Sequence, residues 1–147
     1  MLPITWRPTR TRMVIWTVAV LMTTSMTIVA ILLPKDGGEP WSLPDRISFA
    51  LVGYLGAAVL AILARPKVVA DRDGVTVVNM LSRNRLEWAQ IVRVNLRPGD
   101  PWALLDLDSG DTLPAMGIQT ASGLRAARLA VADLRALVEL YSYGGPE

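Results

Sequence analysis

Two uncharged apolar stretches dominate the first half of the chain. They cover residues 13–33 and 47–64, and neither contains Asp, Glu, Lys or Arg. An α-helix rises about 1.5 Å per residue, so a hydrocarbon core of about 30 Å requires roughly 20 residues. The first stretch has this length, and the second approaches it with the help of residues 42–44. The pattern therefore predicts two transmembrane helices, 13–33 and 47–64, joined as a membrane α-hairpin.

After residue 65 the hydrophobic pattern changes to that of short β-strands. Runs rich in β-branched residues alternate with turn signals made of Asp, Gly, Pro, Ser and Asn. Pro114 lies in the last of these runs, which implies an edge or bulge position. We expect about six short antiparallel strands. The runs are 67–70, 75–80, 85–88, 90–97, 102–107 and 112–116, and the turns include 71–74, 82–84, 98–101 and 108–111.

The final segment has a helical period. Apolar residues recur at steps of three and four, and charged residues fall on the other side. We expect an amphipathic helix of about 20 residues that closes the mouth of a bent sheet, against Trp88, Val92 and Leu105. Its apolar positions are Leu124, Ala127, Val131, Leu134, Val138 and Tyr141.

Charge and composition narrow the function classes. The chain has 147 residues, and we divide it into a tail with the membrane hairpin, 1–65, and a soluble domain, 66–147. Residues 65–147 hold ten basic and ten acidic side chains, so the domain lacks the basic surface of a nucleic-acid-binding protein. Cys and His are absent, which removes thiol nucleophiles and the common zinc ligands. We therefore expect no enzyme, no catalytic or metal site, no cofactor and no nucleic-acid partner.

The basic residues near the apolar stretches predict an orientation. Arg7, Arg10 and Arg12 precede the first stretch, and Arg65 and Lys67 follow the second. Because cytoplasmic flanks are enriched in Lys and Arg, both termini are expected in the cytoplasm of a plasma-membrane protein. A cleaved signal peptide is the competing interpretation, but its apolar region would be only ~7–15 residues long.

Small residues form one stripe on each predicted transmembrane helix. They recur at steps of three or four and so lie on one helix face. Such stripes let helix backbones approach closely in a bilayer. We expect them to pack the hairpin or to dock another membrane subunit. They are Ala19, Thr23, Thr27 and Ala30 in the first helix, and Ala50, Gly53, Ala57 and Ala61 in the second.

Two local patterns follow in the order found in a known family. They are 73–77 (Asp-Gly-Val-Thr-Val) and 86–91 (Leu-Glu-Trp-Ala-Gln-Ile), after a junction at 65–71. With the C-terminal helix, the chain resembles actinobacterial proteins that carry a bacterial pleckstrin-homology (PH-like) domain after membrane helices. The resemblance implies an α+β, mainly β fold, in which a bent antiparallel sheet is capped by a C-terminal helix.

The resemblance also suggests a lipid site. PH domains that bind phosphoinositides use Lys and Arg near their first strands, and Arg forks bind phosphate well. Asp71, Asp73 and Glu87 are interleaved with the basic residues here, which favours weak contact with anionic lipid over a specific headgroup pocket. The candidate contacts are Lys67, Arg72, Arg83 and Arg85.

The sequence thus predicts a non-enzymatic, membrane-anchored interaction module. It would bind a protein partner or support assembly at the cytoplasmic face of the plasma membrane. One alternative is an accessory subunit of a larger integral membrane complex, bound through its transmembrane helices. A second is an adaptor that binds anionic membrane lipids.

Overall fold

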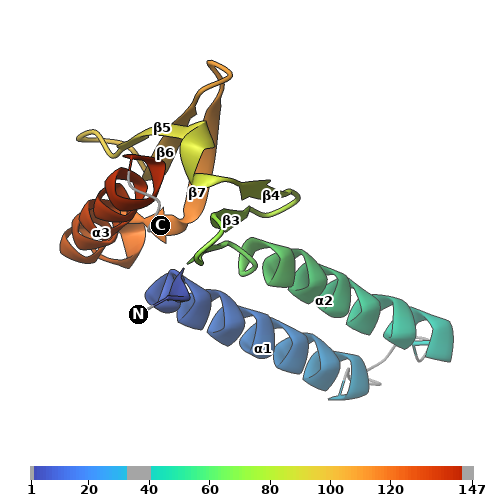
Figure 1. Ribbon diagram of the computed structural model, residues 1–147. Coiled ribbons are helices and arrows are strands. Elements are labelled where there is room, and N and C mark those ends of the chain that lie inside the picture. Colours follow the sequence, from blue (N-terminus) through green and yellow to red (C-terminus); the bar gives the residue numbers. More distant parts are fainter. Residues whose placement is uncertain (1, 33–40, 144–147) are drawn as a thin grey trace. The chain divides into compact units, whose positions relative to one another are not determined.

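The chain forms two compact units. The computed structural model describes residues 2–32 and 41–143. One unit is Arg12–Ala64, and the other combines Met1–Thr11 with Arg65–Glu147. The second unit is thus built from both ends of the sequence, with the helices inserted between them (Figure 1). The sequence analysis had assigned the N-terminal tail to the hairpin.

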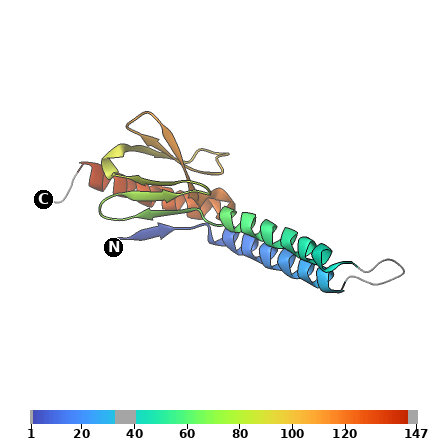
Figure 2. The same cartoon turned by 90° about the vertical axis from the view of Figure 1, so that its right-hand side faces the viewer.

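The inserted unit contains most of one long helix, α1 (Thr9–Leu32), and all of a second, α2 (Leu43–Leu63). They run side by side in opposite directions (Figure 2). Both are long and apolar enough to cross a membrane. Each begins before its apolar stretch, so α1 includes Arg10 and Arg12. The expected end of the first span at residue 33, and most of the expected loop, lie outside the described residues.

The facing ends of the two helices are held by polar contacts. Ser42 caps α2 by accepting the backbone N–H of Asp45, whose carboxylate in turn accepts the N–H of Ser42. This reciprocal arrangement satisfies N–H groups that have no partner inside the helix. Arg46 donates to the carbonyl oxygen of Ile31 at 3.0 Å. A cation at the last turn of α1 is favourable because backbone carbonyls there carry partial negative charge.

The other unit contains two antiparallel sheets and one helix. The first sheet has the order β1 (Ile4–Trp6), β2 (Lys67–Ala70), β3 (Val75–Val78) and β4 (Arg83–Leu86). The second has the order β5 (Ile91–Asn95), β6 (Trp102–Leu107) and β7 (Thr112–Gln119). A short 3-10 helix, η1 (Trp88–Gln90), joins them, and α3 (Leu124–Tyr143) follows β7. The expected antiparallel fold with a C-terminal helix is confirmed.

Some strand positions differ from those expected. β2 and β6 have the expected bounds. β4 begins at Arg83, inside the expected turn, because Asn79 donates its backbone N–H to the carbonyl of Ser82 and closes the turn earlier. Trp88 therefore lies in η1 rather than at the end of a strand.

β1 is a strand that the sequence analysis did not predict. Ile4 pairs with Ala70 and Trp6 with Val68, so the N-terminal segment extends the first sheet beyond β2. Trp6 also packs, half-buried, against the hydrophobic core. A run of three residues gives no period to detect, which is why pattern reasoning missed it.

The core lies between the two sheets and α3. Inward-facing residues alternate with outward ones along β2, as expected of a sheet with one buried face. The α3 stripe meets these residues through its buried positions, although Leu124, expected in that stripe, is exposed. The fully buried large side chains include Val68, Val75, Val77, Val94, Leu105 and Leu134.

A β-bulge changes which residues of β5 face the core. The register shifts between Ile91 and Arg93, so Ile91 and Val94 are both buried. Val92, expected beneath the C-terminal helix, is instead 64% exposed. An extra residue in one strand reverses the alternation beyond it, and the sequence shows no sign of this. The helix instead contacts β5 through Arg135, whose Nε donates to the carbonyl of Val94 at 2.8 Å.

The two sheets meet where β7 crosses β2 and β3. A Cβ atom at Gly117 would lie 2.5 Å from the carbonyl carbon of Lys67, so only glycine permits this backbone approach. Beside it, the buried Asn79 amide donates to the carbonyl of Pro114 at 2.8 Å and accepts the N–H of Met116 at 3.1 Å. Pro114 lies in an outer strand of its sheet, as expected.

Candidate functional site

The turn between β2 and β3 is organised by one carboxylate. Asp71 accepts the backbone N–H groups of Asp73 at 3.0 Å and Gly74 at 3.1 Å. Both terminal nitrogens of Arg85 donate to the same carboxylate, and one of them also contacts the Thr76 hydroxyl at 3.0 Å. Hydrogen bonding to Arg85 holds the pKa of Asp71 below its usual value, and Asp71 raises the pKa of Arg85. This arrangement stabilises a turn rather than activating a group for catalysis.

Trp88, in the second of the two sequence patterns, binds the residues just before the first pattern. Its indole N–H lies 3.2 Å from the carbonyl oxygens of both Asp71 and Arg72. Its ring stacks on Tyr141 of α3 with centroids 5.3 Å apart, and only 5% of Trp88 is exposed. A Cβ atom at Gly74 would collide with the carbonyl oxygen of Leu86. These patterns therefore build the core and its turn, not a ligand pocket.

The four candidate lipid contacts do not form one cluster. Lys67 pairs with Val78, which pairs with Arg83, so both basic residues share one row and one sheet face. Arg85 lies one outward row away, and its guanidinium is engaged by Asp71. Arg72 lies in the turn at the opposite end of the β2–β3 hairpin. Only Lys67 and Arg83 remain as neighbouring outward cations of this set.

An apolar turn lies next to this pair. Leu81, in the connection between β3 and β4, is 88% exposed. Because β2 and β3 are antiparallel, the turn after β3 lies at the end of the sheet where β2 begins. β2 itself begins two residues after Arg65 in the sequence. We call Lys67, Arg83 and Leu81 the basic–apolar edge. Exposure of this leucine could not be predicted from the sequence, since exposure of a turn residue depends on the strand pairing around it.

The small-residue stripes lie along the seam between α1 and α2. A Cβ atom at Gly53 would lie 2.9 Å from the Cβ of Met26 and 3.7 Å from the Cα of Thr23. Replacement of Gly53 by a larger residue therefore tests the packing of the hairpin before any association. Ala19, Ala30 and Gly53 are buried, whereas Thr23, Thr27, Ala50, Ala57 and Ala61 are half-buried.

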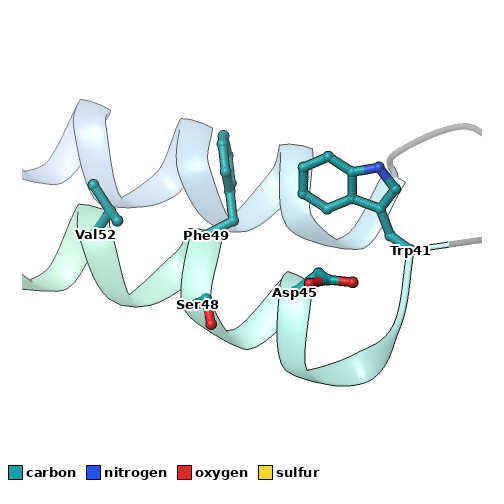
Figure 3. A pocket seen from close by; sticks show the side chains of 5 residues that line it. All are labelled: Trp41, Asp45, Ser48, Phe49 and Val52. Atoms are coloured by element: carbon teal, nitrogen blue, oxygen red, sulfur yellow. The ribbon is translucent and has the colours of Figure 1, made fainter.

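A hollow of about 480 Å³ lies along the first turns of α2. Figure 3 shows its lining, in which the Trp41 and Phe49 rings stand on the same side of the helix. The rings meet edge to face with centroids 6.0 Å apart. Its one acidic group, Asp45, is engaged in capping α2. A Trp at a helix end suits a membrane–water interface, and the hollow offers no free charge to a ligand.

Comparisons with known proteins identify one segment. Residues 65–137 match the profile of the family described as Bacterial PH domain. Uncharacterized proteins of Mycobacterium tuberculosis and Mycobacterium bovis are each 26% identical over 106 residues, which cover 72% of this chain and 68% of each relative. No solved structure matches the chain significantly. The matched segment runs from β2 into α3, whereas β1 precedes it on the other side of the hairpin.

Proposed function

Because residues 65–137 form a bacterial PH domain, we propose that this chain is a membrane-anchored, non-enzymatic interaction module. It binds a protein partner or supports assembly at the cytoplasmic face of the plasma membrane. Two helices with the length and hydropathy of membrane spans support the anchoring. The exposed apolar side chains of these helices support it further, since a surface of that kind is rare on a protein in water.

The observation that carries the proposal is the insertion of the hairpin between β1 and β2. Trp6 pairs with Val68, α1 begins at Thr9, and α2 ends at Leu63. Both helices are therefore joined by short connections to neighbouring strands of one sheet. A module held at two points is suited to a fixed position at the membrane surface rather than to free movement on a long linker.

Strand pairing also constrains the topology. Pairing of β1 with β2 supports a topology in which the residues before α1 and after α2 lie on the same side of the membrane. Both flanks are basic, with Arg7 and Arg10 on one and Arg65 and Lys67 on the other. The positive flanks favour the cytoplasm for both termini.

The acidic side chains with defined contacts support a non-enzymatic role. Asp71 holds a turn and Asp45 caps a helix. Asp106 accepts the Asn95 amide at 2.6 Å and the Thr112 hydroxyl at 3.2 Å across neighbouring strands. Groups committed to backbone turns and strand pairs are poor candidates for proton transfer.

One variant tests both the face of the membrane and the site of binding. The chain has no Cys, so Arg128→Cys on the exposed side of α3 introduces a unique thiol. We expect this thiol to resist an impermeant maleimide in intact cells and to react in inverted vesicles. A photoreactive maleimide attached there should crosslink a protein partner in native membranes.

Val20→Cys, on the exposed side of α1, is the matched control. It tests whether a partner protein is crosslinked through the helices instead of the domain. Labelling of Arg128→Cys in intact cells would overturn the cytoplasmic assignment. Crosslinks obtained from Val20→Cys alone would overturn binding through the domain. They would favour the accessory-subunit alternative, which the outward apolar surface of the hairpin also supports.

The basic–apolar edge supports the lipid adaptor as a second candidate. A leucine beside two cations can enter the headgroup region while Lys67 and Arg83 contact lipid phosphates. The edge begins two residues after Arg65, close along the chain to the end of α2. Its role would be to hold the domain on the lipid surface, which is compatible with a protein partner bound elsewhere.

A further inference from the structure

A shallow groove of about 240 Å³ lies on the hairpin beside the small-residue seam and shares Thr23 and Thr27 with it. Three threonines and Ile28 of α1 line one side, and Tyr54 of α2 lines the other. Tyr54 is 57% exposed. The seam itself is filled by contacts such as that of Gly53 with Met26, whereas Thr24 and Tyr54 in the groove are exposed.

Two hydroxyl groups in this groove have no partner within the part of the chain that the structure describes. The neighbouring hydroxyls of α1 donate to backbone carbonyls three or four residues earlier, as is usual in apolar helices. Thr24 makes no such bond, and neither does Tyr54. The hydroxyls that do are Thr17, Thr23, Ser25 and Thr27, at distances of 2.7–3.0 Å.

The position of these groups makes an absent partner costly. Thr24 and Tyr54 both lie within about two residues of the middle of their apolar stretches, where a bilayer provides no water. Tyrosine usually lies at the membrane interface, about half of the ~30 Å core away from this position. Burial of a hydroxyl without a hydrogen bond is unfavourable. The two groups therefore point to a contact with another molecule inside the membrane.

The geometry identifies the partner as a second copy of this chain. Gly53 packs against Met26 and Thr23, so Tyr54 lies at the same level along the hairpin as Thr24. A two-fold axis along the bilayer normal preserves depth, and most homo-oligomers use two-fold symmetry. The Tyr54 hydroxyl of one copy can then donate to the Thr24 hydroxyl of the other, and the reverse contact forms at the same time. A donor and an acceptor at equal depth are what such a self-complementary contact requires.

We propose that the hairpin self-associates through the Thr24–Tyr54 groove, with two reciprocal hydrogen bonds between the copies. This inference rests on the membrane anchoring in the proposed function, but not on the partner of the PH domain. It gives the hairpin a binding role of its own. The second copy contacts the exposed Thr24 and Tyr54, beside the stripe that packs α1 against α2.

The test uses the full chain, singly labelled and reconstituted in lipid vesicles over a range of surface densities. Counting photobleaching steps gives the fraction of dimers. We expect Tyr54→Phe and Thr24→Val each to weaken dimerisation roughly three- to tenfold, because hydrogen bonds between membrane helices are of modest strength. The double variant should be little worse than either single variant, since both remove the same bonds.

Thr17→Val is the matched control, because its hydroxyl is exposed on α1 but bonded to Met13. It should leave dimerisation unchanged. A monomeric wild type, or equal effects of the control and the groove variants, would overturn the inference. Carbonate extraction of the same vesicles separates the two proposals. A chain that is extracted contradicts membrane anchoring, whereas a monomer that stays in the membrane contradicts only self-association.

Discussion

The two units of this chain place their apolar side chains in opposite directions. In the PH domain the largest buried residues, such as Leu105 and Leu134, face inward. In the hairpin Leu21 and Leu55 are 64% and 65% exposed, and the buried residues are small: Ala19, Ala30, Gly53 and Ala64. The domain thus has an apolar interior, whereas the outward apolar surface of the hairpin suits the proposed lipid surroundings. The difference teaches that similar apolar residues specify different packing once the solvent changes, because lipid supplies no hydrophobic drive between helices.

Two glycines, one in each unit, make this comparison testable. Their substitution should give the largest difference in stability cost between the domain and the hairpin. A Cβ at Gly117 would lie 2.5–2.6 Å from the backbone of Lys67 and Val68, where relief requires separating two sheets. We expect Gly117→Ala to cost about 3 kcal/mol or more of domain stability, at the upper end for overpacking. Gly53→Ala meets the Met26 side chain at 2.9 Å, and two helices can move apart slightly, so about 1 kcal/mol is expected.

Thermal unfolding followed by near-ultraviolet circular dichroism in detergent micelles would measure the Gly117→Ala effect. Hairpin packing in Gly53→Ala is measured by disulfide crosslinking between cysteines introduced along the seam. If Gly117→Ala has the same melting temperature as the unmodified chain, β7 does not approach β2 as closely as described.

The helix that closes the domain should give the next largest effect. Leu134 is fully buried, so Leu134→Ala is expected to cost ~2–5 kcal/mol. Arg128→Ala, on the exposed side of the same helix, should change stability by less than ~0.5 kcal/mol. The melts require the full chain, because a fragment that begins at residue 66 lacks β1. Equal small effects of the two variants would mean that α3 is not part of the core.

Much of this fold could be predicted because its elements follow clear periods. The two apolar helices, β2, β6 and the stripe of α3 all repeat a pattern that depends on one buried face. The parts that were missed depend on distant pairing. β1 becomes a strand only because β2 offers an edge, and Val92 turns outward only because it lies in a bulge.

The candidate sites show the same division. The stripe around Gly53 was visible because helix geometry alone brings its members together. The four basic residues could be named but not grouped, since Asp71 engages Arg85 and strand register separates Arg72 from Lys67. Thr24 could not be singled out from the sequence. Its missing hydrogen bond becomes apparent only when the hydrogen bonds of the neighbouring hydroxyls are known.

The smallest effect is expected from the Asp71–Arg85 pair on the domain surface. Asp71 has a usual pKa of 3.8, which Arg85 and two backbone N–H groups lower in the folded chain. A carboxylate with a lowered pKa stabilises the fold at pH values above 3.8, and this contribution is lost as the pH falls through the folded-state pKa. The pair is partly exposed, so water and salt screen it. We therefore expect acid to reduce domain stability below about pH 3.8, and Asp71→Asn to remove part of that dependence.

Asp133→Asn, on the exposed side of α3, is the control and should leave the pH profile unchanged. Thermal melts from pH 7 to pH 3 would measure this, and parallel profiles for the unmodified chain and Asp71→Asn would show that the carboxylate holds the turn without its charge.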